Sequence, residues 1–151
     1  DGRTVIEGRS IHSTAVYQSL IAYPNNDDVA YDHAIELLTL AASWRPLPDL
    51  TINITDDVET AIGRAERRDN RTYTAEQRQI HRRAADMFAR LAQADPDRVT
   101  VLDRRLHDAD TLVNIMRAQI SGLGQLPCLP EPWRATPACP PACGQPVAKL
   151  A

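Results

Sequence analysis

The sequence predicts an α/β fold in which a parallel sheet is covered by helices on both faces. Three short stretches rich in β-branched residues, at 4–7, 49–55 and 99–103, are separated by helical stretches of ten or more residues. Connections of that length are the crossovers that parallel strands require. The 151 residues, 43% of them hydrophobic, suit one domain with a packed core.

The N-terminal third begins with the expected strand 4–7, which we predict to be short and buried. A helix is expected over 13–23, and Pro24 ends it because proline has no backbone N–H to continue the helix. A second helix is expected over 28–44, and its apolar residues lie on much of its surface. We therefore predict that this second helix is well buried.

The middle third combines a strand with two helix starts. Apolar residues alternate through 49–55 in the manner of a strand, at Leu50, Ile52 and Ile54. Asp56 and Glu59 resemble a capping box that opens a helix, and Thr74 and Gln77 repeat this signal before a longer helix.

The C-terminal third divides into folded and unfolded sequence. After the strand at 99–103, Asp108 is expected to cap a last helix that Gly122 ends. Most of the eleven prolines and all three cysteines fall in 122–151. Proline at that density sustains neither helix nor central strand. We predict a domain at 1–121 and a disordered tail at 122–151.

Charge and hydropathy limit the classes of partner. The formal net charge of −3 predicts no general attraction to nucleic acid or to an anionic membrane. No run reaches the ~18 apolar residues of a membrane span, and no secretory leader is apparent, so we expect a cytoplasmic protein. The chain lacks an initial Met and starts almost directly with a strand, so we expect it to be part of a longer protein.

Arg9 directly follows the first expected strand. Ligands of parallel sheets bind outside the carboxyl ends of the strands, where a guanidinium can grip a phosphate with two hydrogen bonds. The hydroxyls of Ser13 and Thr14, at the next helix start, can add neutral donors. The alternative is that Arg9 pairs with a carboxylate such as Glu7 or Asp103.

The same residues resemble a known family. GRSIHSTAVYQ at 8–18 resembles the acceptor-site motif of thymidylate kinases, in which Asp-Arg ends a strand and two hydroxyl residues, an aromatic residue and Gln follow. PDLTINITDDVETAIGR at 48–64 resembles the family's next strand and helix. RAERRDNRTYTAEQ at 64–77 resembles its arginine-rich lid, and RVTVLDRR at 98–105 its last strand. The resemblance covers 1–121.

The resemblance implies a three-layer P-loop-kinase-like fold that is incomplete at its N-terminus. It implies transfer of the γ-phosphoryl group of ATP, with Mg²⁺, to a nucleoside monophosphate, with dTMP giving dTDP as the first choice. Arg9 would hold the acceptor phosphate and serve catalysis, and four further residues would shape the nucleotide pocket: Ser13, Thr14, Tyr17 and Gln18. Three lid arginines would be catalytic, namely Arg64, Arg68 and Arg71, with Arg67 as the competitor for the position of Arg68.

The lid assignment has an alternative. Seven arginines lie in 64–83, and arginines that close over a transferring phosphoryl group stabilise its charge and exclude water. An equally simple arrangement is a solvated helix face with ion pairs one turn apart, such as those of Glu66 with its neighbours.

The sequence also departs from the family pattern. Gly8 stands where the family has the acid that helps to hold Mg²⁺, Ser10 where it has Tyr or His, and Thr55 where it has a carboxylate. No G-x-x-x-x-G-K-[ST] loop occurs in the 151 residues. We therefore expect the ATP site to lie mostly outside this chain and the chain to be inactive alone, and we assign no residue to a metal.

Two other functions remain open. GRS at 8–10 also resembles deoxynucleoside kinases, whose acceptor is a sugar hydroxyl. A non-catalytic nucleotide-binding or interaction module is the alternative from another class. The expected partners are dTMP and ATP, with neither nucleic acid nor membrane, and a homodimer is allowed. The four histidines show no metal spacing and are interpreted as surface or helix residues: His12, His33, His81 and His107.

Overall fold

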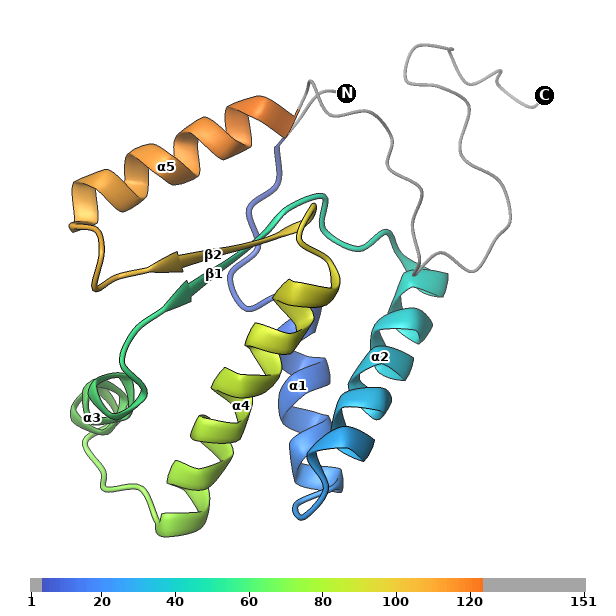
Figure 1. Cartoon of the computed structure of the whole chain (residues 1–151), viewed down its shortest axis with the longest axis vertical. Helices are drawn as coiled ribbons and strands as arrows, with labels where there is room; N and C mark the ends of the chain where they lie inside the picture. Colours follow the sequence, from blue (N-terminus) through green and yellow to red (C-terminus); the bar gives the residue numbers. More distant parts are fainter. Residues whose placement is uncertain (1–3, 124–151) are drawn as a thin grey trace.

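The computed structural model describes residues 4–123 (Figure 1). The elements follow in the order α1 (Ile11–Ala22), α2 (Asp27–Trp44), β1 (Thr51–Thr55), α3 (Val58–Asp69), α4 (Ala75–Ala94), β2 (Val99–Asp103) and α5 (Ala109–Gly122). Each predicted helix is present, and the strands expected at 49–55 and 99–103 are confirmed. The tail predicted at 122–151 lies outside the described residues from 124 onward and stays a prediction.

The two strands form a parallel pair. Thr51 lies opposite Val99, and the register continues without a bulge to Thr55 opposite Asp103. α3 and α4 make the crossover between the strands, and both strands end at the same edge. The predicted α/β architecture with parallel strands is therefore confirmed.

Helices cover the strands from both sides, which gives three layers. Figure 1 shows α5 on one side of β1 and β2, and α1, α2 and α4 on the other. Gln119 of α5 donates from Nε2 to Oγ1 of Thr100, 3.3 Å away. The preceding residue, Val99, points to the opposite face, as neighbouring strand residues do, and is buried.

The strand predicted at 4–7 is absent, and its predicted burial is wrong. These residues have no regular secondary structure, and Val5 and Ile6 are 87% and 80% exposed. An extended segment becomes a strand only when a neighbour takes up its backbone hydrogen bonds. In the described part of the chain, β1 pairs with β2 and not with this segment.

The main core lies among three helices rather than beside the sheet. α1 packs against both α2 and α4. Small and branched side chains interlock there, and the buried set is Ala15, Val16, Leu20, Ala30, Ala34, Leu38, Ala84, Met87 and Leu91. α2 buries only one face, because Val29 and Trp44 are 41% and 84% exposed, so the prediction of a well-buried helix is wrong.

A buried arginine fixes the turn between α1 and α2. Arg83 of α4 is 9% exposed and donates to the backbone carbonyl oxygens of Pro24 and Tyr23, at 2.6 and 2.8 Å. Its Nε donates to Asp27 Oδ1, also at 2.6 Å. These bonds occupy carbonyls that follow the last turn of α1, where no helical N–H is available.

The helix caps lie at the predicted residues except at α3, where the cap is one residue later. Thr74 and Gln77 form the predicted capping box of α4, and Asp108 caps α5 by accepting from the N–H of Thr111. At α3 the cap is Asp57 rather than Asp56, and its carboxylate accepts from the N–H of Thr60. Among the helices of residues 4–123, none combines the length and apolar content needed to cross a bilayer.

Candidate functional site

Arg9 lies at the entrance to α1 in an unusual backbone conformation. Its φ of 64° is left-handed, which costs a residue with a Cβ about 1–2 kcal/mol. The helix begins directly after it, with Ser10 as N-cap. The carboxylates considered as partners for Arg9 have other ion pairs, Glu7 with Arg45 and Asp103 with Arg105.

The charge of Arg9 affects the pKa of the Tyr17 hydroxyl. Burial raises the pKa of the Tyr17 hydroxyl, and the positive charge of Arg9 acts in the opposite direction because it favours the ionised phenolate. Arg9 and Tyr17, both predicted from the sequence to bind the acceptor, therefore lie within electrostatic range of one another.

The other predicted pocket residues divide between two faces of α1. Thr14 and Gln18, one turn apart, line a groove of about 590 Å³ between α1 and α2. Apolar side chains make up most of its wall, including the exposed Leu40 and Trp44. Tyr17 points instead to α4, and Ser13 lies one turn before it, so the four residues do not converge on one point.

An aromatic cluster joins α1 to the loop between α3 and α4. The Tyr17 hydroxyl lies 3.2 Å from Nδ1 of His81, on α4. The ring of Tyr73 stacks on the imidazole ring of His81, with the two centroids 5.1 Å apart and an interplanar angle of 18°. Arg71 lies over the Tyr73 ring, 4.9 Å from its centroid.

Burial, together with a nearby positive charge, favours the neutral form of the His81 imidazole in this cluster. Burial lowers the pKa of His81, and the nearby Arg71 lowers it further, while Asp69 opposes both effects. Asp69 itself accepts hydrogen bonds from Arg68 and from the Tyr73 hydroxyl, and these hold its pKa at about 2. The end of α3 thus places Arg68 beside an ionised carboxylate, and the loop after it places Arg71 over an aromatic ring.

The predicted lid arginines have different environments. Arg64 forms an ion pair with Asp56, and Arg68 donates from Nε to Asp69 Oδ1 at 2.8 Å. Arg67 lowers the pKa of Glu66 by its charge, and Arg71 alone of the four lies on the aromatic cluster. The arginines occupy an exposed helix and the loop after it.

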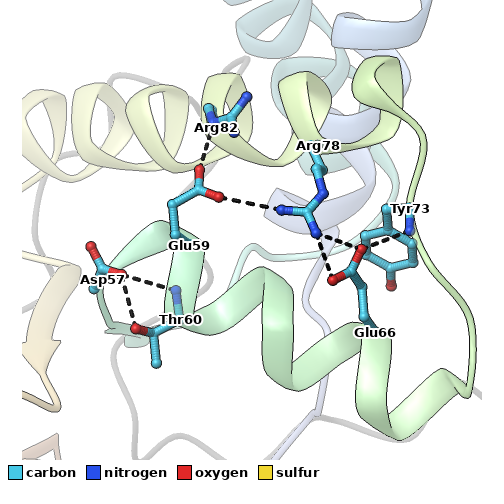
Figure 2. A network of polar contacts seen from close by, with 7 residues as sticks. All are labelled: Asp57, Glu59, Thr60, Glu66, Tyr73, Arg78 and Arg82. Atoms are coloured by element: carbon cyan, nitrogen blue, oxygen red, sulfur yellow. Dashed lines mark hydrogen bonds and ion pairs between the residues drawn. The ribbon is translucent and has the colours of Figure 1, made fainter.

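Ion pairs between α3 and α4 hold this region together, as Figure 2 shows. Arg78 donates to both carboxylate oxygens of Glu66, at 2.8 and 2.7 Å. Glu66 also accepts from the backbone N–H of Tyr73 at 2.7 Å, the largest cause of its lowered pKa. Glu59, about two turns before Glu66 in α3, pairs with Arg78 and Arg82. Glu66 therefore pairs across to α4, and not with the neighbours one turn away on its own helix.

The carboxyl ends of the strands carry acidic and basic residues together. Asp56 follows β1 and Asp103 ends β2, but the first pairs with Arg64 and the second with Arg105. In residues 4–123 no group of three or more His, Cys, Asp or Glu side chains is arranged to hold a metal ion. The residues present here therefore do not by themselves fit Mg²⁺, and we derive no step through it.

Two members of the cluster were missed by the sequence analysis. His81 was interpreted only as a surface or helix histidine, and Tyr73 was not singled out. Tyr17 and His81 are 64 residues apart, so no local spacing connects them. The one available signal was the position of Tyr73, two residues after Arg71 within the expected lid.

Comparison with known proteins identifies the family. The family model described as thymidylate kinase matches residues 1–113. The chain belongs to the thymidylate kinase family. A curated relative, a thymidylate kinase of Dehalococcoides mccartyi, is 30% identical over 132 residues. That match covers 84% of this chain and 58% of the relative, so the chain spans little more than half the length of that protein. No solved structure matches the chain significantly.

Proposed function

We propose that the chain supplies the acceptor-binding and arginine-rich part of an enzyme that transfers the γ-phosphoryl group of ATP to dTMP. The observation that carries the proposal is the approach of two separate segments to one aromatic cluster. Tyr17 of α1, whose phenol is within electrostatic range of Arg9, forms a hydrogen bond with His81, and Arg71 lies over the Tyr73 ring that stacks on His81. Family membership supplies the reaction class.

In this proposal each residue has a role that its chemistry suits. The guanidinium of Arg9 holds the acceptor phosphate, because a charge-assisted pair with two hydrogen bonds is strong and directional. Tyr17 and Ser13 bind the acceptor from one face of α1, and Thr14 and Gln18 from the neighbouring face.

The lid arginines would act on the transferring group. Arg64, Arg68 and Arg71 stabilise the charge that develops there, with Arg67 as the competitor for Arg68. Arg64 and Arg68 must exchange their carboxylate partners, Asp56 and Asp69, for phosphate oxygens. This exchange is feasible because both side chains are solvent-accessible, at 46% and 67% exposure.

ATP and Mg²⁺ are part of the proposal through the family. The three glycines within residues 4–123 lie before α1, inside α3 and at the end of α5, so none opens a strand-to-helix loop that cradles phosphates. We propose that residues outside 4–123 provide that loop. A cytoplasmic location and a homodimer also remain proposals.

Calorimetric titration with dTMP and with thymidine tests the acceptor role. We expect dTMP to bind more tightly, and Arg9→Ala to weaken dTMP by about 1.5–3 kcal/mol while leaving thymidine nearly unchanged. Arg90→Ala is the matched control, since Arg90 pairs with Asp28 and stacks on Tyr31, away from the cluster. Equal affinity of the unmodified chain for both ligands would contradict the phosphate role.

Nucleotide binding without transfer is a second candidate function. It is favoured by Gly8 in place of the family's acid and by the existing carboxylate partners of Arg64 and Arg68. A coupled assay of dTMP-dependent ADP release separates the two, on these 151 residues and on a longer protein that includes a phosphate loop. Release by the longer protein supports transfer, and dTMP binding without release supports the second candidate.

A further inference from the structure

His81 contacts the acceptor side and the arginine side of the proposed site at once. Its Nδ1 lies 3.2 Å from the Tyr17 hydroxyl on α1, and the two rings meet edge to face with centroids 5.9 Å apart. Its ring stacks on Tyr73, in the loop that carries Arg71. The two contacts use different parts of the imidazole, so they can be removed separately.

The stack of His81 on Tyr73 is one of several contacts that hold the loop between α3 and α4, the arginine loop, at residues 70–74. The Tyr73 hydroxyl donates to Asp69 at 2.7 Å, and the Tyr73 N–H donates to Glu66. Tyr73 is 7% exposed, which shows that its ring is fully packed. Since Arg71 lies over this ring, 4.9 Å from its centroid, the position of its guanidinium depends on the position of Tyr73.

The hydrogen bond between His81 and Tyr17 fixes the direction in which the Tyr17 O–H points. A neutral imidazole with its proton on Nε2 accepts a hydrogen bond from the Tyr17 hydroxyl at Nδ1, which leaves the phenol oxygen with lone pairs for a ligand donor. Burial and the charge of Arg71 both favour the neutral form, by lowering the pKa of His81. The hydroxyl group is thereby oriented before a ligand arrives.

We propose that His81 is a positioning residue for the nucleotide site, which holds the Tyr17 hydroxyl toward the acceptor and the Arg71 loop beside it. The inference rests on the proposed function, because Tyr17 and Arg71 act together only if a nucleotide lies between them. His81 acts through these two residues and needs no contact of its own with the substrate. Loss of its hydrogen bond and loss of its stack should therefore have different consequences.

Two substitutions separate the contacts in the 151-residue chain. His81→Asn keeps a polar atom near the place of Nδ1 and removes the ring that stacks on Tyr73. His81→Phe keeps the ring and removes the hydrogen bond to Tyr17. His107→Phe, on the loop before α5, controls for the added phenylalanine.

Two measurements report on the two contacts. The affinity for dTMP should fall about three- to tenfold in His81→Phe, the effect of one lost hydrogen bond, and stay near the original value in His81→Asn. The rate of trypsin cleavage after Arg71 should rise in His81→Asn and stay low in His81→Phe, because proteolysis follows local opening of the loop. His107→Phe should change neither quantity.

Parallel changes in both quantities, or no change in either, would overturn the positioning role, because a merely structural histidine does not separate them. Should His81→Phe fail to fold by circular dichroism, Tyr17→Phe removes the same hydrogen bond and keeps the imidazole ring that stacks on Tyr73. A chain that binds no dTMP at all would overturn the proposed function instead. The trypsin contrast between the variants would then still decide whether His81 holds the arginine loop.

Discussion

The layer of α1, α2 and α4 and the layer of β1 and β2 differ in how completely they are buried. In the helical layer, Val16 and Leu20 are wholly inaccessible to solvent. In the sheet, Ile54 and Val101 are 48% and 45% exposed, although both belong to strands with apolar sequences. The helices therefore form a closed core, whereas the strands keep part of their apolar surface in contact with water.

This difference follows from how the two kinds of element satisfy their backbones. A helix closes its hydrogen bonds within itself and needs neighbours only for its apolar stripe. A strand needs another strand beside it, and β1 has β2 on one edge only in the described part of the chain. The core of the helical layer should consequently carry more of the stability than the sheet does.

The largest expected effect is that of emptying the helical core. Leu20→Ala should lower the free energy of unfolding by about 2–5 kcal/mol, because the side chain is completely enclosed and its removal leaves a cavity. Ile54→Ala, in the half-exposed sheet, should cost about 1 kcal/mol or less. Urea unfolding followed by circular dichroism measures both, and equal losses would show that the two layers contribute alike.

The same contrast explains what could be predicted of the fold. The capping box at Thr74 and Gln77 and the cap at Asp108 are local signals, and both were correct. The strand at 99–103 was predicted with its observed bounds. The segment 4–7 has an equally apolar sequence, yet forms no strand, because pairing depends on residues that are remote in the chain.

The site was less predictable than the fold for a related reason. Arg9 and Tyr17 belong to one short motif, and the charge of Arg9 acts on the Tyr17 hydroxyl. The separation of Tyr17 from Thr14 and Gln18 requires knowledge of which helix packs on each face of α1. The part played by His81 depends on a contact across 64 residues, and such contacts leave no periodicity in a single sequence.

A smaller effect is expected where α4 holds the turn of the helical layer. Arg83→Met should lower the free energy of unfolding by about 2 kcal/mol, because two carbonyl oxygens next to a buried side chain lose their charged donor. Arg82→Met is the matched control on the same helix, since Arg82 is 44% exposed and forms an ion pair at the surface. That change should cost about 0.5 kcal/mol or less.

Chemical denaturation at constant pH compares the two arginine variants directly. A loss for Arg83→Met no larger than that for Arg82→Met would mean that the turn between α1 and α2 is stable without α4. The hydrogen bonds from Arg83 to this turn would then add no more stability than a surface ion pair does. A clear excess for Arg83→Met would show that polar contacts also close this layer.

The smallest expected effect concerns His12, which lies where the two layers meet. It is 8% exposed, and its Nδ1 lies 3.4 Å from Ser10 Oγ and 3.5 Å from Thr51 Oγ1 at the start of β1. Burial lowers the pKa of His12, and Arg98 lowers it further, against the opposing charge of Asp95. Protonation therefore favours the unfolded chain, in which the imidazole has its ordinary pKa near 6.5.

The stabilisation by neutral His12 is fully present above pH 6.5 and is lost progressively as the pH falls toward the folded pKa. The free energy of unfolding should therefore decrease between pH 7.5 and pH 5, a window in which Asp69 and Asp103, with pKa values of about 2, stay ionised. His81 has a lowered pKa as well and contributes with the same sign. His12→Gln should flatten the dependence of the free energy of unfolding on pH only in part. Adding His81→Asn to that variant should remove the remaining slope. A profile for His12→Gln parallel to that of the unmodified chain would show that the junction of the two layers admits a charged imidazole without loss, and that water reaches it.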